Sequence, residues 1–332
     1  MSEATKVFAD EKGKATITEK DDGIKLIKVQ SYDGHFVPIK SCRTVYPLSL
    51  IELIFRIKGS GYLCDEICRE TNPDYVQRDL KKDLTAYFTK KEFTGKRILD
   101  FGSGSGASTM ILSRMFPDAE IVGIELEEKL LDIARARLEF YKYPNIKFYL
   151  SPSGVELPPD VGEFDFVIMS AVYEHLLPKE RETVIPQVWS IIKQDGNLFL
   201  NMTPHRWFLV EHHTTGLPLL NYLPPKLALP VSRKFSGRID KTEPWETLLR
   251  RGIRGGTENE ILGILEKNFK NKPILLEPSQ KNLKDRIDLW HSQLNQKNHR
   301  TIKRLLKSFL KTVRAVSGVT LVPNLSLVVK KV

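Results

Sequence analysis

A glycine-rich turn is the feature of this sequence whose residue types and spacing point most directly to chemistry. Gly102, Gly104 and Gly106 alternate after an apolar segment, and Asp100 precedes the first of them by two residues. Glycine lets the backbone approach a ligand closely, and a helix that begins at such a turn presents free N–H groups to it. Glu125 follows about 20 residues later, where nucleotide sites carry a carboxylate for the ribose. The pattern predicts a site for a nucleotide-like cofactor.

Two classes of cofactor fit this turn. The glycines and Ala107 satisfy the dinucleotide fingerprint, so a nicotinamide-dependent oxidoreductase is one interpretation. However, Asp100 stands where dinucleotide sites usually have an apolar strand residue, and the glycines alternate as in methyltransferases. Together with segment 163–176, these residues resemble the class I S-adenosylmethionine-dependent methyltransferase family. The resemblance covers residues 73–202 and the last strand.

The resemblance implies S-adenosyl-L-methionine as the cofactor and suggests a role for each residue of the turn. Asp100 would support the turn and the amino-acid end of the cofactor, and Glu125 would accept hydrogen bonds from both ribose hydroxyls. Many relatives end the third strand with an acidic residue that contacts the adenine, whereas this chain has Ser151 and Ser153 as replacement candidates. The expected cofactor-binding residues are Asp100, Gly102, Ser103, Gly104, Gly106, Glu125, Leu126, Ser151, Ser170 and Ala171.

Three histidines occur in segment 203–224, which also contains an arginine, a glutamate and an apolar run. Doubly wound sheets bind ligands beyond the carboxyl ends of their strands, so we expect this segment at the substrate site. An oxygen acceptor must lose a proton, and imidazole takes up protons near neutral pH. His205, His212 and His213 are therefore candidate catalytic bases. The alternatives are loop histidines bonded to backbone or metal ligands; no spacing is diagnostic of a metal, and we predict none.

The acceptor is constrained only by resemblance. Enzymes that methylate nucleic-acid bases often carry Asn/Asp-Pro-Pro-aromatic after the fourth strand, whereas this chain has Ser170-Ala171-Val172-Tyr173. Segments 203–224 and 323–331 resemble uncharacterised methyltransferases associated with bacterial surface-glycan synthesis. We expect a small-molecule, glycan or lipid-linked acceptor that is methylated on oxygen. A nucleic-acid-binding methyltransferase or binding protein is the alternative, although no RNA-binding module accompanies the basic charge, so we do not expect nucleic acid as a partner.

These residues must be positioned by a sheet, and the sequence predicts one. Short apolar strands alternate with helices of about three turns, which indicates a doubly wound, mainly parallel α/β sheet. The resemblance makes it a seven-stranded Rossmann-like sheet with helices on both faces, an N-terminal extension and substrate-side insertions. The expected strands are 97–101, 120–125, 146–150, 164–169, 197–202, 273–276 and 321–329, and the expected helices are 74–88, 107–116, 127–141, 178–193 and 300–317. Asn72-Pro73 has the form of a helix N-cap, and residues 1–45 suggest irregular or short-stranded structure.

We divide the chain into an N-terminal extension or cap (1–72), a cofactor-binding core (73–202), a substrate-side insertion (203–257) and a C-terminal part of the sheet (258–332). At 332 residues, with 41% hydrophobic and 28% charged residues, the composition is that of a globular protein. The N-terminus lacks a signal sequence and no segment is apolar enough to span a bilayer, so we expect a cytoplasmic protein. Three cysteines, an odd number, predict reduced thiols.

The net charge of +10 is concentrated near the C-terminus, where segment 281–314 holds ten basic residues against two acids. Within it, 300–317 has apolar residues at helical spacing and basic residues on the other faces. A basic amphipathic helix of this kind binds an anionic membrane surface or packs on the protein with a solvated charged face. Our hypothesis is a peripheral position on the inner face of the membrane through residues 300–317.

Overall fold

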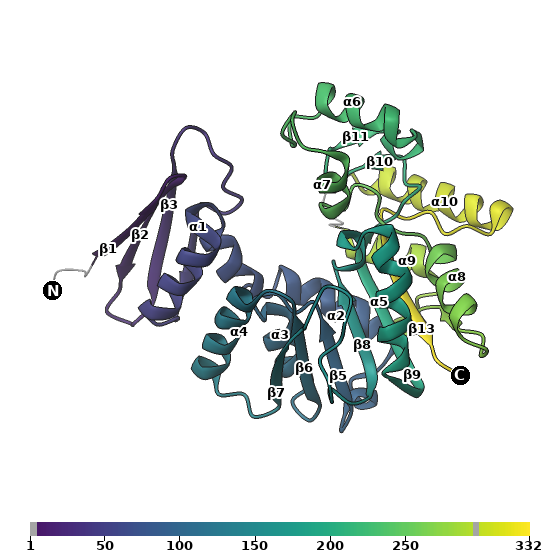
Figure 1. Ribbon diagram of the computed structural model, residues 1–332, viewed down its shortest axis with the longest axis horizontal. Coiled ribbons are helices and arrows are strands. Elements are labelled where there is room, and N and C mark those ends of the chain that lie inside the picture. The colour runs from purple at the N-terminus through teal and green to yellow at the C-terminus, as the bar shows by residue number, and fades with distance from the viewer. Residues whose placement is uncertain (1–4, 295–298) are drawn as a thin grey trace. The chain divides into compact units, whose positions relative to one another are not determined.

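The computed structural model describes residues 5–294 and 299–332, which fall into two compact units (Figure 1). The first unit takes in residues 1–81 and 103–150, and the second takes in residues 82–102 and 151–332. The chain therefore passes between the units inside the glycine turn, after Gly102.

Seven strands form a sheet in the order β12-β13-β9-β8-β5-β6-β7. Strand β6 is parallel to β7, and β8 is parallel to β5 and β9, whereas β13 is antiparallel to both β9 and β12. The expected doubly wound, mainly parallel sheet is confirmed. Its strands are β5 (Arg97–Phe101), β6 (Glu120–Glu125), β7 (Ile146–Leu150), β8 (Phe164–Ser170), β9 (Ile192–Pro204), β12 (Ile274–Leu276) and β13 (Asn324–Lys330).

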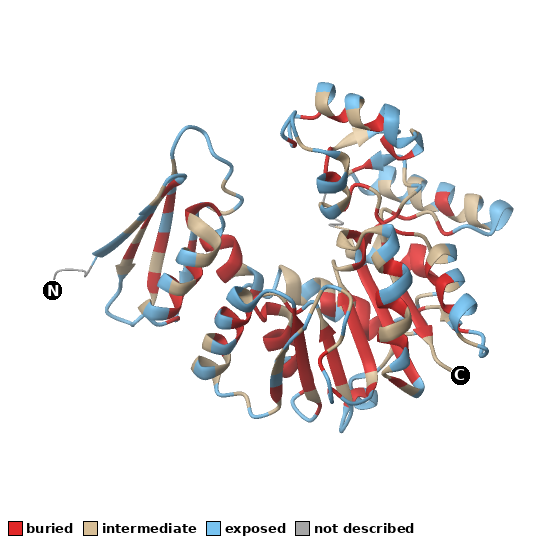
Figure 2. Ribbon diagram, in the orientation of Figure 1, coloured by how far each residue is buried: buried red, intermediate tan, exposed pale blue. Residues whose placement is uncertain are grey.

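The five helices predicted for this part of the chain also lie close to their predicted positions, whereas the helices Glu258–Asn268 and Arg286–Gln293 were not predicted. One boundary differs clearly, because α5 ends at Ser190 and β9 already begins at Ile192, five residues before the expected strand. Burial is concentrated in the strands of the sheet (Figure 2). The helices are α2 (Val76–Tyr87), α3 (Ala107–Met115), α4 (Glu128–Tyr141), α5 (Pro178–Ser190), α8 (Glu258–Asn268), α9 (Arg286–Gln293) and α10 (Arg300–Ser317), with a short 3-10 helix η1 (Lys90–Phe93) before β5.

The N-terminal region is more regular than the sequence suggested. Its four strands form an antiparallel sheet in the order β1 (Thr5–Asp10), β2 (Gly13–Glu19), β3 (Lys25–Ser31), β4 (Ser41–Thr44). Residues of β2 and β3 alternate between buried and accessible, which places one face of the sheet against α1 (Leu48–Thr71). Of the irregular or short-stranded structure expected here, the short strands are confirmed, whereas their pairing into one sheet was not predicted. The three cysteines have free thiols, as expected.

The predicted N-cap at Asn72 was also wrong. Asn72 is the C-cap of α1, since its N–H donates to the carbonyl of Cys68, and its side chain accepts the N–H of Asp74 in the following turn. Helix α2 begins only at Val76. A proline after Asn72 is equally typical of the end of a helix, because proline cannot continue one.

The second unit also contains residues 203–257, the predicted substrate-side insertion, which have a small core of their own around Leu220 and Leu248. A cluster of aromatic rings joins α2 and η1 to strands β8 and β9, with Phe93 and Phe166 at 4.5 Å between ring centroids. The additional elements are η2 (Tyr173–His175), β10 (Val210–Glu211), β11 (Leu217–Pro218), η3 (Leu220–Tyr222), α6 (Pro225–Phe235) and α7 (Trp245–Arg250).

Candidate functional site

The glycine turn links β5 to α3 through left-handed backbone conformations, with φ of +72° at Gly102, +55° at Gly104 and +78° at Gly106. Gly106 is the N-cap of α3, and a Cβ at this position would lie 2.8 Å from the Cβ of Ala134 in α4. Only glycine fits there, so the turn is held close against α4. The predicted role of the glycines as a close-approach turn therefore has a geometric basis.

Glu125 ends β6 and is tied to the backbone of the first unit at both carboxylate oxygens. Its Oε2 accepts the N–H of Gly104 at 2.7 Å, and its Oε1 accepts those of Leu126 at 2.8 Å and Glu127 at 3.0 Å. The side chain of Ser103 is buried, and its Oγ has no hydrogen-bond partner within the described residues. A fixed carboxylate beside an unused hydroxyl offers both an acceptor and a donor to a polar ligand such as a ribose.

A buried ion pair supports the same turn, and the sequence analysis did not find it. Arg137 of α4 is fully buried and donates to the carbonyl of Ser105 at 2.7 Å and to its Oγ at 2.8 Å. Its Nη2 lies 3.1 Å from Oε1 of Glu66 in α1, which also accepts the hydroxyl of Ser105. Burial opposes ionisation of Glu66, but Arg137 and then Lys58 outweigh it and hold the pKa of that carboxyl below its usual range. The side chains of Arg137 and Glu66 therefore hold Ser105 in place.

The remaining cofactor candidates lie in the second unit at the carboxyl ends of its strands. Asp100 is buried in β5, and Ser170 ends β8. Ala171 adopts a left-handed conformation, with φ of +54°, and donates its N–H to the carbonyl of Asn201. Such a conformation is strained for alanine and is typical of functional sites. Ser151 instead donates within its own loop, to the carbonyls of Ser153 and Glu156.

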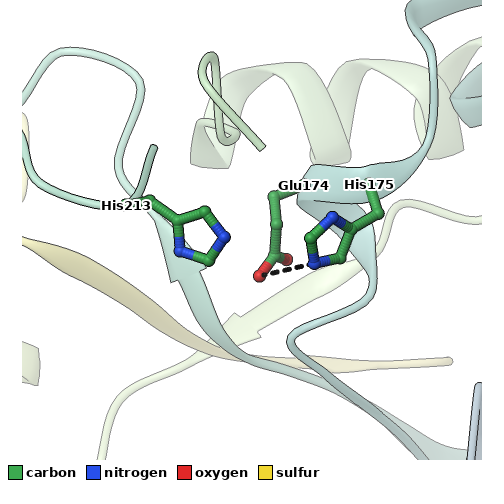
Figure 3. A group of neighbouring side chains, drawn as sticks. All are labelled: Glu174, His175 and His213. Carbon is green, nitrogen blue, oxygen red and sulfur yellow. Dashed lines mark ion pairs between the residues drawn. The ribbon is translucent and has the colours of Figure 1, made fainter. Parts of the chain in front are cut away.

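The three candidate histidines have different environments. His205 is buried, and its Nδ1 accepts the N–H of Trp207; burial and the charge of Arg286 lower its pKa to about 4. His212 directs Nε2 to Oδ1 of Asn324 at 2.9 Å. His213 is exposed and lies beside Glu174 and His175 (Figure 3). The structure therefore separates the histidines instead of gathering them.

Glu174 and His175 of η2 form a cluster with His213 that the sequence analysis did not select. One donor atom from each residue lies within 4.8 Å of the other two, and Nε2 of His175 is 3.9 Å from Oε1 of Glu174. Burial raises the pKa of Glu174, although His175 opposes the shift. For His213, desolvation and then the neighbouring His175 lower the pKa. The set contains two imidazoles and a carboxylate, which are ligands for transition metals.

A cavity of about 580 Å³ opens in the second unit, a size typical of small-molecule sites. Arg206 and Arg254 lie at its wall, stacked on Trp207 and Trp245 respectively. Both guanidinium groups donate to backbone carbonyls and, within the described chain, neither pairs with a carboxylate. Burial and then Arg254 lower the pKa of Arg206 to about 10, which still leaves the guanidinium charged at neutral pH. The wall of the cavity therefore carries positive charge that no ion pair among the described residues neutralises at these two arginines. Its other polar and aromatic lining residues include Arg181, Tyr222 and Glu260.

Comparison with known proteins agrees with the geometry of the turn. Residues 98–196 match the model of the methyltransferase domain family. The chain is 37% identical to a protein-L-isoaspartate O-methyltransferase of Nitrobacter winogradskyi over 95 residues, which are 28% of this chain and 42% of that protein. It is 28% identical to a demethylmenaquinone methyltransferase of Lactococcus lactis over 134 residues, covering 40% and 52% of the two chains.

The matched region is limited in extent, since the chain spans about half or less of the length of these curated relatives. Among solved structures it is similar to a plantazolicin methyltransferase, BpumL, in complex with a substrate analogue and SAH. That similarity has a TM-score of 0.44 and 13% identity, and it covers 85% of this chain and 96% of that chain.

Proposed function

Because residues 98–196 match the methyltransferase domain family, we propose that the whole chain is a class I S-adenosylmethionine-dependent methyltransferase that transfers the methyl group of this cofactor to a small acceptor. The observation that carries the proposal is the hydrogen bond between Glu125 and the N–H of Gly104, which joins the expected ribose-binding carboxylate to the glycine turn. Asp100, Ser103, Ser170 and Ala171 are the proposed partners of the rest of the cofactor, and Ser151 remains the candidate for the adenine contact.

Binding of the cofactor is the first test. A ligand that binds only the folded state stabilises it by about 2.7 kcal/mol at a hundredfold excess over Kd. We expect S-adenosylmethionine and S-adenosylhomocysteine to raise the Tm by a few degrees and NAD⁺ to leave it unchanged. A shift with NAD⁺ alone would instead support the oxidoreductase interpretation.

For the acceptor, the charge of the 580 Å³ cavity supports an anionic molecule. Arg206 and Arg254 already stack on indole rings, and a phosphate or carboxylate would neutralise them in a partly desolvated wall. This fits a small molecule, glycan or lipid-linked acceptor that carries such a group. Labelled methyl transfer to matched pairs of phosphorylated and unphosphorylated sugars tests the idea, and preference for the neutral member would contradict it.

An oxygen atom is the proposed methyl acceptor. Of the three histidines, His213 has the accessible imidazole, and it lies in a cluster with the buried Glu174. Glu174 follows Ser170 by four residues, so the two Cα atoms are at most about 14 Å apart. The cluster can therefore act on an acceptor that reaches the end of β8. Product analysis by mass spectrometry and alkaline stability would distinguish a methyl ether from a methylated amine.

Peripheral membrane association through residues 300–317 is the second part of the proposal. Helix α10 packs on α9 through Leu310, and Lys307 and Lys311 pair with Asp288, so part of the expected basic surface faces the protein. The opposite face exposes apolar side chains, namely Ile302, Leu305, Phe309 and Val316. No helix in residues 5–294 and 299–332 is long and apolar enough to cross a membrane. The exposed apolar stripe fits a lipid surface, and Arg300 and Arg304, which are exposed on another face of the same helix, add positive charge that anionic lipids would attract.

A further inference from the structure

We infer that Glu174, His175 and His213 bind a divalent transition-metal ion, and that the ion activates the hydroxyl of the acceptor. The second statement rests on the proposed methyltransferase function, whereas the first does not. Ions such as Zn²⁺ and Co²⁺ favour imidazole nitrogens and carboxylate oxygens at about 2.0–2.2 Å. Two donors of one ion then lie roughly 3–3.5 Å apart. The observed limit of 4.8 Å and the 3.9 Å between Glu174 and His175 require only a small approach of the side chains.

The carboxylate of Glu174 has one oxygen that lacks a protein donor among the described residues. The side chain is fully buried, its Oε2 accepts the hydroxyl of Thr203 at 3.0 Å, and its Oε1 has no hydrogen-bond donor in the described part of the chain. A buried carboxylate oxygen without a donor is costly. A cation at this position would remove that cost, and both imidazoles of the cluster are placed to bind the same cation.

The orientation of His175 points to the same conclusion. Its Nδ1 lies 2.6 Å from the carbonyl of Arg250, which can only accept a hydrogen bond, so Nδ1 carries a proton. In the neutral ring, Nε2 then carries a lone pair and lies 3.9 Å from Oε1 of Glu174. Two acceptors that face each other repel, and a metal cation bound by both would remove that repulsion. A hydrogen bond from Nδ1 to a carbonyl is the usual way in which proteins orient a metal-binding imidazole.

The backbone around the cluster is built to hold it. Glu211 accepts the N–H groups of His213 and Thr214 at 3.0 and 2.9 Å, and the hydroxyl of Thr214 donates to the carbonyl of Arg251 at 2.8 Å. Gly252 adjoins this turn with φ of +86°, and a Cβ there would lie 2.7 Å from Cδ2 of His213 and 3.0 Å from Cγ of Glu174. Glycine therefore provides the room in which these two side chains meet.

Three protein ligands leave coordination positions open, as in catalytic metal sites. A hydroxyl bound at such a position loses its proton to water at a lower pH than in solution. Its oxygen then forms the new O–C bond while the C–S bond of the sulfonium breaks, which gives a methyl ether and S-adenosylhomocysteine. No oxidant or reductant is needed.

Metal binding by the full chain, freed of metal with EDTA, tests the inference directly. We expect one Zn²⁺ per chain by calorimetry and visible absorption bands when Co²⁺ is added instead. His213→Ala and Glu174→Gln should each weaken Zn²⁺ binding at least about tenfold. The matched control is His212→Ala, whose imidazole bonds Asn324, and it should change binding less than twofold.

Unchanged Zn²⁺ affinity in His213→Ala, or an equal loss in His212→Ala, would overturn the inference. Because Glu174 is buried, Glu174→Gln could fail to fold, and in that case the exposed His213 carries the test. Binding of S-adenosylmethionine, measured on the same samples, separates the two proposals. If S-adenosylmethionine binds but Zn²⁺ does not, only the inference of a metal site fails. If Zn²⁺ binds but S-adenosylmethionine does not, the proposed function fails and the metal site stands.

Discussion

The Oε2 atom of Glu125 lies 2.7 Å from the backbone nitrogen of Gly104, so the carboxylate at the end of β6 holds the glycine turn directly. Glu125 also caps the start of the following segment through the N–H groups of Leu126 and Glu127. One side chain therefore has two functions, since it shapes the turn and offers its remaining lone pair to the ribose of the proposed cofactor.

Glu125→Gln is expected to weaken binding of S-adenosylmethionine by about tenfold to a hundredfold. The amide keeps the size of the side chain but loses the charge and one acceptor, and hydrogen bonds to charged groups are worth about 1.5–3 kcal/mol. Isothermal titration calorimetry would measure the change. Glu127→Gln makes the same charge change at an exposed neighbour and should leave the affinity within twofold. Equal affinities in the two variants would remove Glu125 from the proposed site.

Arg137→Met is expected to destabilise the protein by about 3–5 kcal/mol, because it removes the nearer counter-charge of the buried carboxylate of Glu66 and leaves only Lys58 at 3.7 Å. Arg135→Met, two residues away on the same helix, removes an exposed pair with Glu128 and should cost less than about 1 kcal/mol. Urea denaturation would compare them. Similar values for the two variants would mean that Arg137 does not support the turn through this pair.

Much of the central sheet could be predicted, because its information is local. Alternation of short apolar strands with helices marks the strands from Arg97 to Met202, and the glycines mark the turn. Asn72 could not be interpreted in this way, since an Asn-Pro pair fits the end of one helix as well as the start of the next. The choice depends on α1, which packs on the N-terminal sheet through contacts distant in sequence.

The candidate site was predicted in part for the same reason. His213 was selected as one of three neighbouring histidines, but its partner Glu174 lies 39 positions earlier and reaches it only through the tertiary fold. Glu66 and Arg137 are separated still further, and neither stands in a recognisable motif. Two residues that are distant in sequence and meet only in the fold form no local motif, whereas a turn between a strand and a helix is recognisable from consecutive residues.

The stability of the protein is expected to fall as the pH is lowered from about 6.5 to 4, in part through His205. Burial and then Arg286 lower the pKa of this histidine to about 4 in the folded state, so below pH 6.5 the unfolded chain binds a proton that the folded chain does not. This proton uptake by the unfolded chain lowers the free energy of unfolding by about 3 kcal/mol at pH 4 and has almost no effect above pH 6.5.

His205→Asn keeps an acceptor for the N–H of Trp207 but cannot titrate in this range. Denaturation at a series of pH values should therefore show a shallower decline for this variant than for the wild type. Parallel curves would show that His205 is not held neutral by its surroundings.

Helix α10 provides the test of membrane association. Leu305 and Phe309 are 66% and 56% exposed, and burial of such side chains in an apolar phase contributes about 1.5–3 kcal/mol each. Replacement of both by serine should lower partitioning onto anionic vesicles by at least about a hundredfold, measured by co-sedimentation at low salt. Thr312→Ser, an exposed change on the same helix, is the control and should leave binding intact. If the wild-type protein does not sediment with vesicles that contain phosphatidylglycerol, the exposed stripe does not bind membranes.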